Sequence, residues 1–308
     1  MDFEQIRVFL NVASLKSFSA AAEKMFISQP SVSVRIKALE EELGVVLFER
    51  SKAREPVLTE AGRLFLNYAQ SFINLQDQCK ESLSGQREEM TGMVYIGAST
   101  VPGTYILPLL FADFKGACPA IDFSIEILDT SAVLEGILNY SFDLGFVGLL
   151  REDDRLAYLP LVDDELLFCT PKGLLKSKEH SDIIGLGSCT GLHLLMREKG
   201  SATRKLLEKA LIKNNFSFDM FSGVTYFNSM EGIKEAVRHG LGVAFLSRLS
   251  VQDMAEGSKI DCYRVKELDL SRSLYLVSHR NRVLGKAAEN LKDFTAEYFQ
   301  GGDNNGQS

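Results

Sequence analysis

The chain lacks the features of an exported or membrane protein. In its 308 residues, no apolar run approaches the roughly 20 residues that a membrane-spanning helix needs. The N-terminus, MDFEQIRVF, has no basic segment followed by an apolar core and does not resemble a signal peptide. We therefore expect a cytoplasmic protein without a membrane partner.

Paired cysteines are absent as well. The five cysteines are scattered and include no CxxC pair, which argues against a disulfide framework and against a zinc site. They are Cys79, Cys118, Cys169, Cys189 and Cys262. We predict free thiols and no bound metal. A redox switch between two of them stays open, because a sequence does not give distances in space.

The sequence has little that resembles an active site. Its four histidines are isolated and form no HExxH pair. The segment Ser188–Gly191 lacks the GxSxG spacing of a nucleophile elbow, and Gly240–Gly242 is not a GxGxxG fingerprint. We predict a protein without enzymatic activity, catalytic residues or cofactor.

Positive charge is in short supply, since the net charge is −7. Residues 1–87 hold 11 basic and 11 acidic side chains, whereas residues 88–308 hold 23 basic and 30 acidic ones. A neutral N-terminal segment on an acidic body permits DNA binding through a local basic face. It argues against a protein that coats nucleic acid non-specifically.

The stretch from Ser17 to Leu43 predicts two short helices with a tight connection. The first starts at Ser17 or Ser19, and the second starts at Ser28 with Pro30 in its first turn. Residues 25–27 are apolar and are expected to plug the turn. The buried stripe of the second helix is Val32, Ile36, Leu39 and Leu43.

The opposite face of this second helix is polar and basic. It carries Gln29, Ser31, Ser33, Arg35 and Lys37. Such a face suits the major groove of double-stranded DNA, where glutamine can pair with adenine and arginine with guanine. The alternative is an ordinary helical hairpin whose polar face is only solvated.

The flanking residues favour the DNA-binding interpretation. After Gly44, residues 45–50 and 57–58 predict the two strands of a wing around a charged turn. In order along the chain, Phe9, AAAEKMFISQPSVSVRIKALEEELGVVLFER and LTEAG resemble the N-terminal signature of the LysR-type transcriptional regulators. The resemblance implies base contacts from Gln29, Ser31, Ser33 and Arg35. Contacts to phosphates are expected from Lys37, Arg50, Lys52, Arg54 and Thr59. RNA polymerase is expected as a further partner.

Residues 59–90 predict a long linker helix with a heptad seam. Its positions are Ala61, Phe65, Tyr68, Phe72, Leu75, Cys79 and Ser82. We predict that a second copy covers this seam, giving a dimer or a tetramer. The alternative is an amphipathic helix packed on its own domain.

Beyond residue 91, strands and helices alternate, which predicts parallel sheets covered by helices. Strands are expected at 93–98, 122–128, 143–147, 156–161, 166–171, 223–227, 242–246, 260–267 and 272–278. Helices are expected at 105–115, 133–140, 202–214, 230–239 and 283–299. This pattern resembles the two-lobed, periplasmic-binding-protein-like effector domain of LysR-type regulators.

The predicted fold is therefore mixed α and α/β, in three parts. Residues 1–58 form a winged helix-turn-helix, 59–90 a dimerisation helix and 91–308 an effector domain. Lobe I is expected at about 91–162 and 268–300, lobe II at about 163–267, and a disordered tail at 301–308.

Polar residues follow several of the predicted strands, where helix N-termini favour anions. They are Ser99, Thr100, Thr130, Arg197, Ser201, Thr203 and Asn228. Taken singly, each hydroxyl or amide is explained by helix capping. The family resemblance implies that these residues line one effector cleft, and we expect a small oxyanion or a short carboxylate there.

Two finer points stay open. Residues 196–204, MREKGSATR, resemble the sulfur-metabolism branch of the family. The rival functions are a redox-sensing regulator switched by cysteine oxidation, and a small-molecule-binding protein that does not bind DNA.

Overall fold

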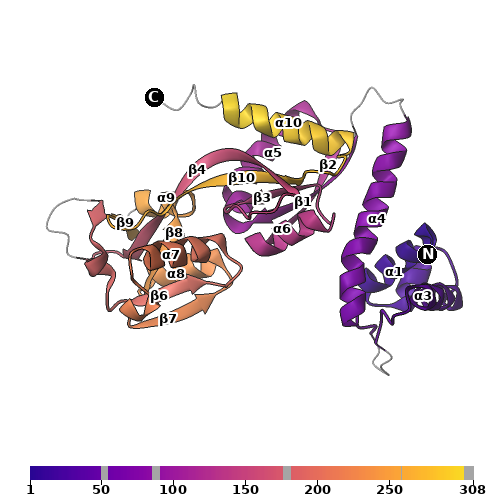
Figure 1. Cartoon of the computed structure of the whole chain (residues 1–308), viewed down its shortest axis with the longest axis horizontal. Helices are drawn as coiled ribbons and strands as arrows, with labels where there is room; N and C mark the ends of the chain where they lie inside the picture. Colours follow the sequence, from indigo (N-terminus) through magenta and orange to yellow (C-terminus); the bar gives the residue numbers. More distant parts are fainter. Residues whose placement is uncertain (50–54, 85–90, 176–181, 258, 302–308) are drawn as a thin grey trace.

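The computed structural model of the chain describes residues 1–49, 55–84, 91–175, 182–257 and 259–301. In Figure 1 a helical head packs beside one long helix, and an α/β body of two lobes follows. The mixed helical and α/β fold predicted from the sequence is confirmed. No helix in the described ranges is both long and apolar enough to cross a membrane.

Three helices form the head: α1 (Phe3–Leu15), α2 (Phe18–Lys24) and α3 (Gln29–Leu43). The Ser17 hydroxyl accepts the N–H of Ala20, and the Ser28 hydroxyl accepts the N–H of Ser31. Gly44 ends α3 with φ 69°, a left-handed conformation that glycine adopts without strain. The predicted caps of the hairpin are therefore confirmed.

The core of the head is built on aromatic and aliphatic side chains. The stripe predicted for α3 is confirmed, because Val32, Ile36 and Leu39 are buried. Its neighbour Phe9 is fully buried, and its ring centroid lies 5.4 Å from that of Phe48. The prediction for the turn was wrong at Phe26, which is 95% exposed. Only its neighbours on either side pack against the core.

The wing is smaller than predicted. Within the described residues it contains one isolated bridge, between Phe48 and Leu58, in place of two strands. A side chain replaces part of the backbone hydrogen bonding expected between two strands. Glu40 Oε1 accepts the N–H groups of Leu47 at 2.7 Å and Phe48 at 3.2 Å. This contact fixes α3 against the wing.

The long helix α4 (Glu60–Ser84) passes very close to the wing. A Cβ at Gly62 would lie 2.1 Å from the carbonyl oxygen of Leu47. A side chain there would push the helix away, which explains the glycine of the LTEAG segment.

The predicted heptad seam of α4 divides between two faces. Phe65 packs into the head core, together with Ala69 and Ile73, which lie outside the seam. The middle of the seam, Tyr68, Phe72, Leu75 and Cys79, is exposed in a single chain. The head therefore covers one face of α4 and leaves an apolar stripe on another.

The body contains ten strands among the described residues. In the first lobe they are β1 (Gly92–Ser99), β2 (Ile121–Leu128) and β3 (Leu144–Val147). The second lobe contains β5 (Ile183–Ile184), β6 (His193–Arg197), β7 (Gly223–Phe227), β8 (Val243–Ser247) and β9 (Ile260–Val265). Two long strands, β4 (Leu156–Pro171) and β10 (Ser271–His279), cross between the lobes (Figure 1).

Helices cover these sheets. The first lobe has a π-helical turn (Pro102–Ile106), α5 (Leu107–Ala117), α6 (Thr130–Leu138) and α10 (Lys286–Gly301). The second lobe has α7 (Ala202–Lys213), α8 (Met230–Arg238), α9 (Arg248–Glu256) and short 3-10 turns at Leu186–Cys189 and Phe218–Met220. Strands β5 and β6 and helix α9 were not predicted from the sequence.

The sheet is mixed, so the prediction of purely parallel sheets was too simple. Its strand order is β2-β1-β3-β10-β4-β8-β6-β7. The inner strands of each lobe pair in parallel, whereas β4 and β10 run antiparallel to each other and to their neighbours. The carboxyl ends of β1, β2 and β6 therefore carry the loops that open helices, as in other open α/β sheets.

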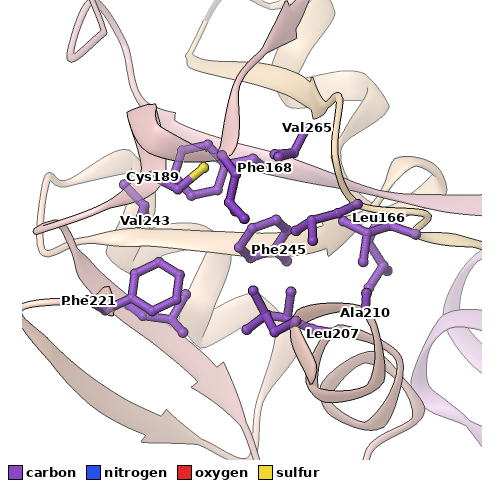
Figure 2. Packing of buried hydrophobic residues seen from close by; sticks show 14 of the residues in the cluster. Leu166, Phe168, Cys189, Leu207, Ala210, Phe221, Val243, Phe245 and Val265 are labelled. Atoms are coloured by element: carbon purple, nitrogen blue, oxygen red, sulfur yellow. The ribbon is translucent and has the colours of Figure 1, made fainter. Parts of the chain in front are cut away.

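The second lobe has its own apolar core. In Figure 2 Phe168 and Phe245 lie at its centre, with Leu166 and Val265 beside them and Leu207 below. The rings of Phe168 and Phe245 lie 5.0 Å apart. Residues of α7 and β6 belong to this core, which packs both elements against the sheet.

Candidate functional site: a DNA-facing helix and an interlobe cavity

The first candidate site is the outer face of α3. Gln29 and Lys37 are exposed, and Ser31 and Ser33 are half-buried. Gln29 Nε2 donates to the hydroxyl of Ser33 at 3.1 Å. Gln29, Ser31 and Ser33 lie in the first two turns of the helix, the part that a recognition helix presents to base edges, and Lys37 begins the third turn.

The charged residues of this face are engaged with neighbouring carboxylates. Arg35 Nη1 lies 3.0 Å from Glu4 Oε2, and Lys37 Nζ lies 3.4 Å from Glu41 Oε1. Exposed pairs of this kind are worth only about 0–1 kcal/mol. Both cations can therefore exchange their partner for a phosphate or a base at little cost.

Of the other predicted DNA contacts, only Thr59 lies in the part of the chain that the structure describes. Arg50, Lys52 and Arg54 lie outside the described residues. The Thr59 hydroxyl donates to the carbonyl oxygen of Val46 at 2.6 Å and accepts the N–H of Gly62 at 2.9 Å. It caps α4, which leaves this hydroxyl without a hydrogen to give to a phosphate.

The second candidate site is a small cavity between the lobes. Three helix starts line it: the turn at Thr100 after β1, α6 after β2 and α7 after β6. Six of the seven predicted effector residues line this inner cavity: Ser99, Thr100, Thr130, Arg197, Ser201 and Thr203. Its volume is about 20 Å³, which is room for a group about the size of a water molecule.

Two buried arginines border the inner cavity. Arg197, 5% exposed, donates from Nε and Nη2 to the Glu198 carboxylate at 2.7 Å, and from Nη2 to the Thr100 hydroxyl at 3.3 Å. Among the described residues its Nη1 has no hydrogen-bond partner. Arg272 donates to Asp164 Oδ2 at 2.9 and 2.8 Å and reaches Thr203 at 3.4 Å.

The two guanidinium groups influence each other electrostatically. Burial lowers the pKa of Arg272, the buried carboxylate of Asp164 opposes this shift, and the positive charge of Arg197 adds to the lowering. A negative charge placed near Arg272 would favour its protonated form.

Two hydroxyl groups in the inner cavity are available for a ligand. Thr130 is 2% exposed, and its Oγ1 is buried without a hydrogen-bond partner among the described residues. Ser201 occupies the N-cap position of α7, but its side chain makes no capping hydrogen bond. A buried hydroxyl without a partner is costly, and a bound acceptor would remove that cost.

A larger outer cavity of about 400 Å³ adjoins the inner one. They share Thr100, Leu128, Asp129 and Arg197 as lining residues. The remaining predicted effector residue, Asn228, is exposed and lines this outer cavity with Ser229, the N-cap of α8. The volume is typical of a small-molecule site.

Two residues that border the inner cavity, Asp129 and Arg272, were not predicted from the sequence. Asp129 caps α6 through its Oδ1, which accepts the N–H of Ala132 at 2.9 Å. Its position directly before Thr130 was a usable signal. Arg272 reaches the cavity from the crossing strand β10, and no local motif marks it.

The lobes meet at this cavity. Arg197 and Lys205 of the second lobe donate to the Thr100 and Ser131 hydroxyls of the first, the latter at 2.7 Å. A Cβ at Gly200 would lie 2.3 Å from the carboxyl carbon of Asp129. The approach of the lobes therefore depends on glycine at position 200.

Comparisons with protein families match both the head and the body of the chain. Residues 3–63 match the bacterial regulatory helix-turn-helix protein, LysR family, and residues 87–300 match the LysR substrate binding domain.

Several known proteins are similar to this chain. A probable RuBisCO transcriptional regulator from Cyanophora paradoxa is 31% identical over 292 residues, covering 92% of this chain and 88% of that protein. One from Synechocystis is 30% identical, covering 92% and 83%.

Solved structures share the fold. A full-length OxyR variant from Pseudomonas aeruginosa has a TM-score of 0.70 at 23% identity, covering 96% of this chain and 98% of that one. CbnR complexed with its target DNA has a TM-score of 0.69 at 19% identity, covering 96% and 99%. The effector-binding domain of QuiR in complex with shikimate has a TM-score of 0.61 at 20% identity, covering 69% and 99%.

The helix-turn-helix head, the two-lobed body and these matches lead to one assignment. The chain belongs to the LysR family and is a DNA-binding transcriptional regulator with an effector-binding domain.

Proposed function

We propose that this regulator reads an operator through α3 and is controlled by a small anionic effector bound between its lobes. The observation that carries the proposal is the inner cavity, where three helix starts, two buried arginines and the unpartnered Thr130 hydroxyl meet. All three features favour an acceptor with negative charge. Effector binding would change how the lobes close and thereby how the heads are held on DNA.

The domain division goes with this proposal. We assign 1–58 to the DNA-binding head, 59–90 to a dimerisation helix and 91–308 to the effector domain. The exposed apolar stripe on α4 supports a dimer, because single large apolar side chains are ordinary on a surface but a continuous stripe calls for a partner. The same proposal includes a tetramer and a contact with RNA polymerase. It also includes a cytoplasmic location, where the protein would bind DNA.

On DNA, we assign base contacts to Gln29, Ser31, Ser33 and Arg35, and phosphate contacts to Lys37, Arg50, Lys52 and Arg54. Phe26 joins this surface, since its exposed ring lies two residues before the N-cap of α3. An apolar side chain there is suited to a thymine methyl group.

The first prediction separates base contacts from phosphate contacts. Arg35→Ala should cost about 1–3 kcal/mol on the operator and almost nothing on random DNA, because a base contact carries the sequence information. Lys37→Ala is the matched control on the same face and should weaken binding on both DNAs alike. Fluorescence anisotropy at fixed salt measures both. Equal losses on operator and random DNA for Arg35→Ala would refute its assignment to a base.

The second prediction concerns the effector. In a thermal-shift screen of the full chain against inorganic oxyanions, carboxylates, amino acids and their precursors, we expect an anion to stabilise the body. At a hundred times its dissociation constant it adds about 2.7 kcal/mol. The panel includes sulfate and sulfur-containing precursors, because residues 196–204 resemble the sulfur-metabolism branch of the family.

Two arginine variants, one at the cavity and one away from it, locate the binding site of the stabilising anion. Arg197→Gln should reduce the affinity of the stabilising anion by about tenfold or more, since a hydrogen bond to a charged group contributes about 1.5–3 kcal/mol. Arg204→Gln, which removes an ion pair with Glu208 on α7, should leave it unchanged. A stabilising anion that binds the Arg197 variant as tightly as the wild type would place the site elsewhere.

A redox switch is the second candidate, and one observation favours it. Cys169 and Cys262 lie opposite each other on β4 and β9, with their sulfur atoms 3.4 Å apart. Hydrogen peroxide could oxidise the two thiols to a disulfide, taking two protons and two electrons and leaving two water molecules. Burial raises the pKa of the Cys169 thiol, which slows that chemistry. A peroxide-dependent disulfide that changes operator binding would favour this candidate over the anionic effector.

A further inference from the structure

The cavities between the lobes are bordered by a carboxylate that would repel a purely anionic effector. Asp129 is the one carboxylate among the residues that line the inner cavity. It lines the outer cavity too, with Glu198 and Glu231. This position, between a site for an anion and a larger chamber, constrains the chemistry of the effector.

The three carboxylates differ in how they are neutralised. Glu198 is paired with Arg197 at 2.7 Å, and Glu231 is paired with Lys234 at 3.0 Å. No cation of the described residues lies within ion-pair distance of Asp129, whose side chain accepts the N–H of Ala132 as the N-cap of α6. Asp129 therefore lies at the junction of the two cavities without a cationic side chain beside it, and only the N-terminus of α6 opposes its charge.

We infer that the effector is a zwitterion, in which an anionic group occupies the inner cavity and an adjacent ammonium group contacts Asp129. This inference rests on the proposed function, since it assumes that the inner cavity binds the anion. The Thr130 hydroxyl, 2% exposed and without a hydrogen-bond partner among the described residues, independently indicates that the cavity binds a hydrogen-bond acceptor.

The volumes set the arrangement of the charges. The inner cavity of about 20 Å³ accepts little more than a carboxylate oxygen, whereas the outer one of about 400 Å³ accepts the rest of a small molecule. Asp129 borders both, so the positive group must lie within a bond or two of the anionic one. An α-amino acid has this arrangement, with its side chain in the outer cavity.

The arrangement also explains how binding would act on the lobes. Asp129 belongs to the first lobe and lies against Gly200 of the second. Arg197 and Ser201 approach the same cavity from the second lobe. A zwitterion therefore contacts Asp129 and Thr130 of the first lobe and, through its carboxylate, Arg197 of the second lobe, and it stabilises the closed arrangement.

The experiment compares matched acids on the full chain by titration calorimetry and thermal shift. Each common L-amino acid is paired with the carboxylic acid that lacks the amino group, such as aspartate with succinate and glutamate with glutarate. In the wild type, we expect one amino acid to bind at least tenfold more tightly than its partner.

The test variant is Asp129→Asn, because asparagine caps a helix as well as aspartate does. This variant should bind the amino acid more weakly, because the attraction between Asp129 and the ammonium group is lost. It should bind the amino-free acid more tightly, because the repulsion between Asp129 and the carboxylate is also lost. A role for Asp129 in folding alone would weaken both. Glu208→Gln on α7 is the control, because the carboxylate it removes is paired with Arg204 at 2.8 Å and lines neither cavity, and it should leave the ratio unchanged.

The outcomes separate this inference from the proposed function. Suppose that the amino-free acids bind as tightly as the paired amino acids and that Arg197→Gln abolishes this binding. That result would refute the zwitterion and would still support the anion site. An unchanged ratio in Asp129→Asn would also overturn it. If no compound of either set binds, the zwitterion fails, and the anion site fails with it unless an inorganic oxyanion of the thermal-shift screen binds.

Discussion

Replacing Arg272 with methionine should lower the free energy of unfolding of the body by about 3–5 kcal/mol. Its guanidinium is 6% exposed and binds an Asp164 side chain that is 0% exposed. Removing the cation leaves that carboxylate buried with the Ser247 hydroxyl, 2.9 Å away, as its one remaining side-chain donor among the described residues. Breaking a buried pair from one side is far more costly than replacing both partners. Urea unfolding of the body, followed by circular dichroism, measures the loss.

A double variant separates stability from ligand binding. Asp164→Asn with Arg272→Met leaves no unpaired charge, so it should recover much of the lost stability. It should still bind the anion more weakly, because one of the two guanidinium groups at the cavity is gone. A single Arg272→Met variant as stable as the wild type would show that the pair contributes nothing. Full anion affinity in the double variant would remove Arg272 from the site.

Replacing Phe9 with alanine should destabilise the head by about 3–5 kcal/mol and abolish operator binding near the temperature at which the head then unfolds. The side chain is 0% exposed, and its ring lies 5.4 Å from Phe48 and 5.0 Å from Phe65. Large-to-alanine changes at such positions lose both burial and packing. Anisotropy with operator DNA across temperature measures the loss.

The matched control is Phe3→Ala on the same helix. Phe3 is 44% exposed, so its removal should change stability by no more than about 0.5 kcal/mol. Anion-induced stabilisation of the body should survive in Phe9→Ala, because the body has separate cores. Undiminished operator binding by Phe9→Ala at all temperatures would contradict the packing described for the head.

The head was predictable because its signals are local. Ser28, Pro30 and Gly44 act within one turn of α3, and their physical roles depend on neighbours in sequence. Phe26 was misplaced for the opposite reason. An apolar residue in a turn looks like core material until the backbone conformation, here φ 55°, decides where the side chain points.

Strand β4 shows what sequence patterns hide. The acidic run Asp163–Glu165 divides its apolar residues, so two strands were predicted where the structure has one. The acids are neutralised from other strands. Asp164 binds Arg272 on β10, and Glu165 Oε1 lies 2.6 Å from Arg264 on β9. Charge pairing between distant segments is invisible to local periodicity.

The candidate effector site was partly predictable in the same sense. Ser99, Thr130 and Ser201 follow strands, and parallel strands bring such positions to one edge. The buried pair of Asp164 and Arg272 depends on strands that cross between lobes, so only the fold reveals it.

The central claim is that a small molecule between the lobes controls how the head reads DNA. The most direct test is the affinity of the full chain for its operator, measured with and without the stabilising compound, in the wild type and in Arg197→Gln. We predict that the compound changes operator affinity by at least fivefold in the wild type, a coupling of about 1 kcal/mol, and has no effect in the variant at the same concentration. An unchanged operator affinity at saturating compound, or the same change in both proteins, would contradict the account.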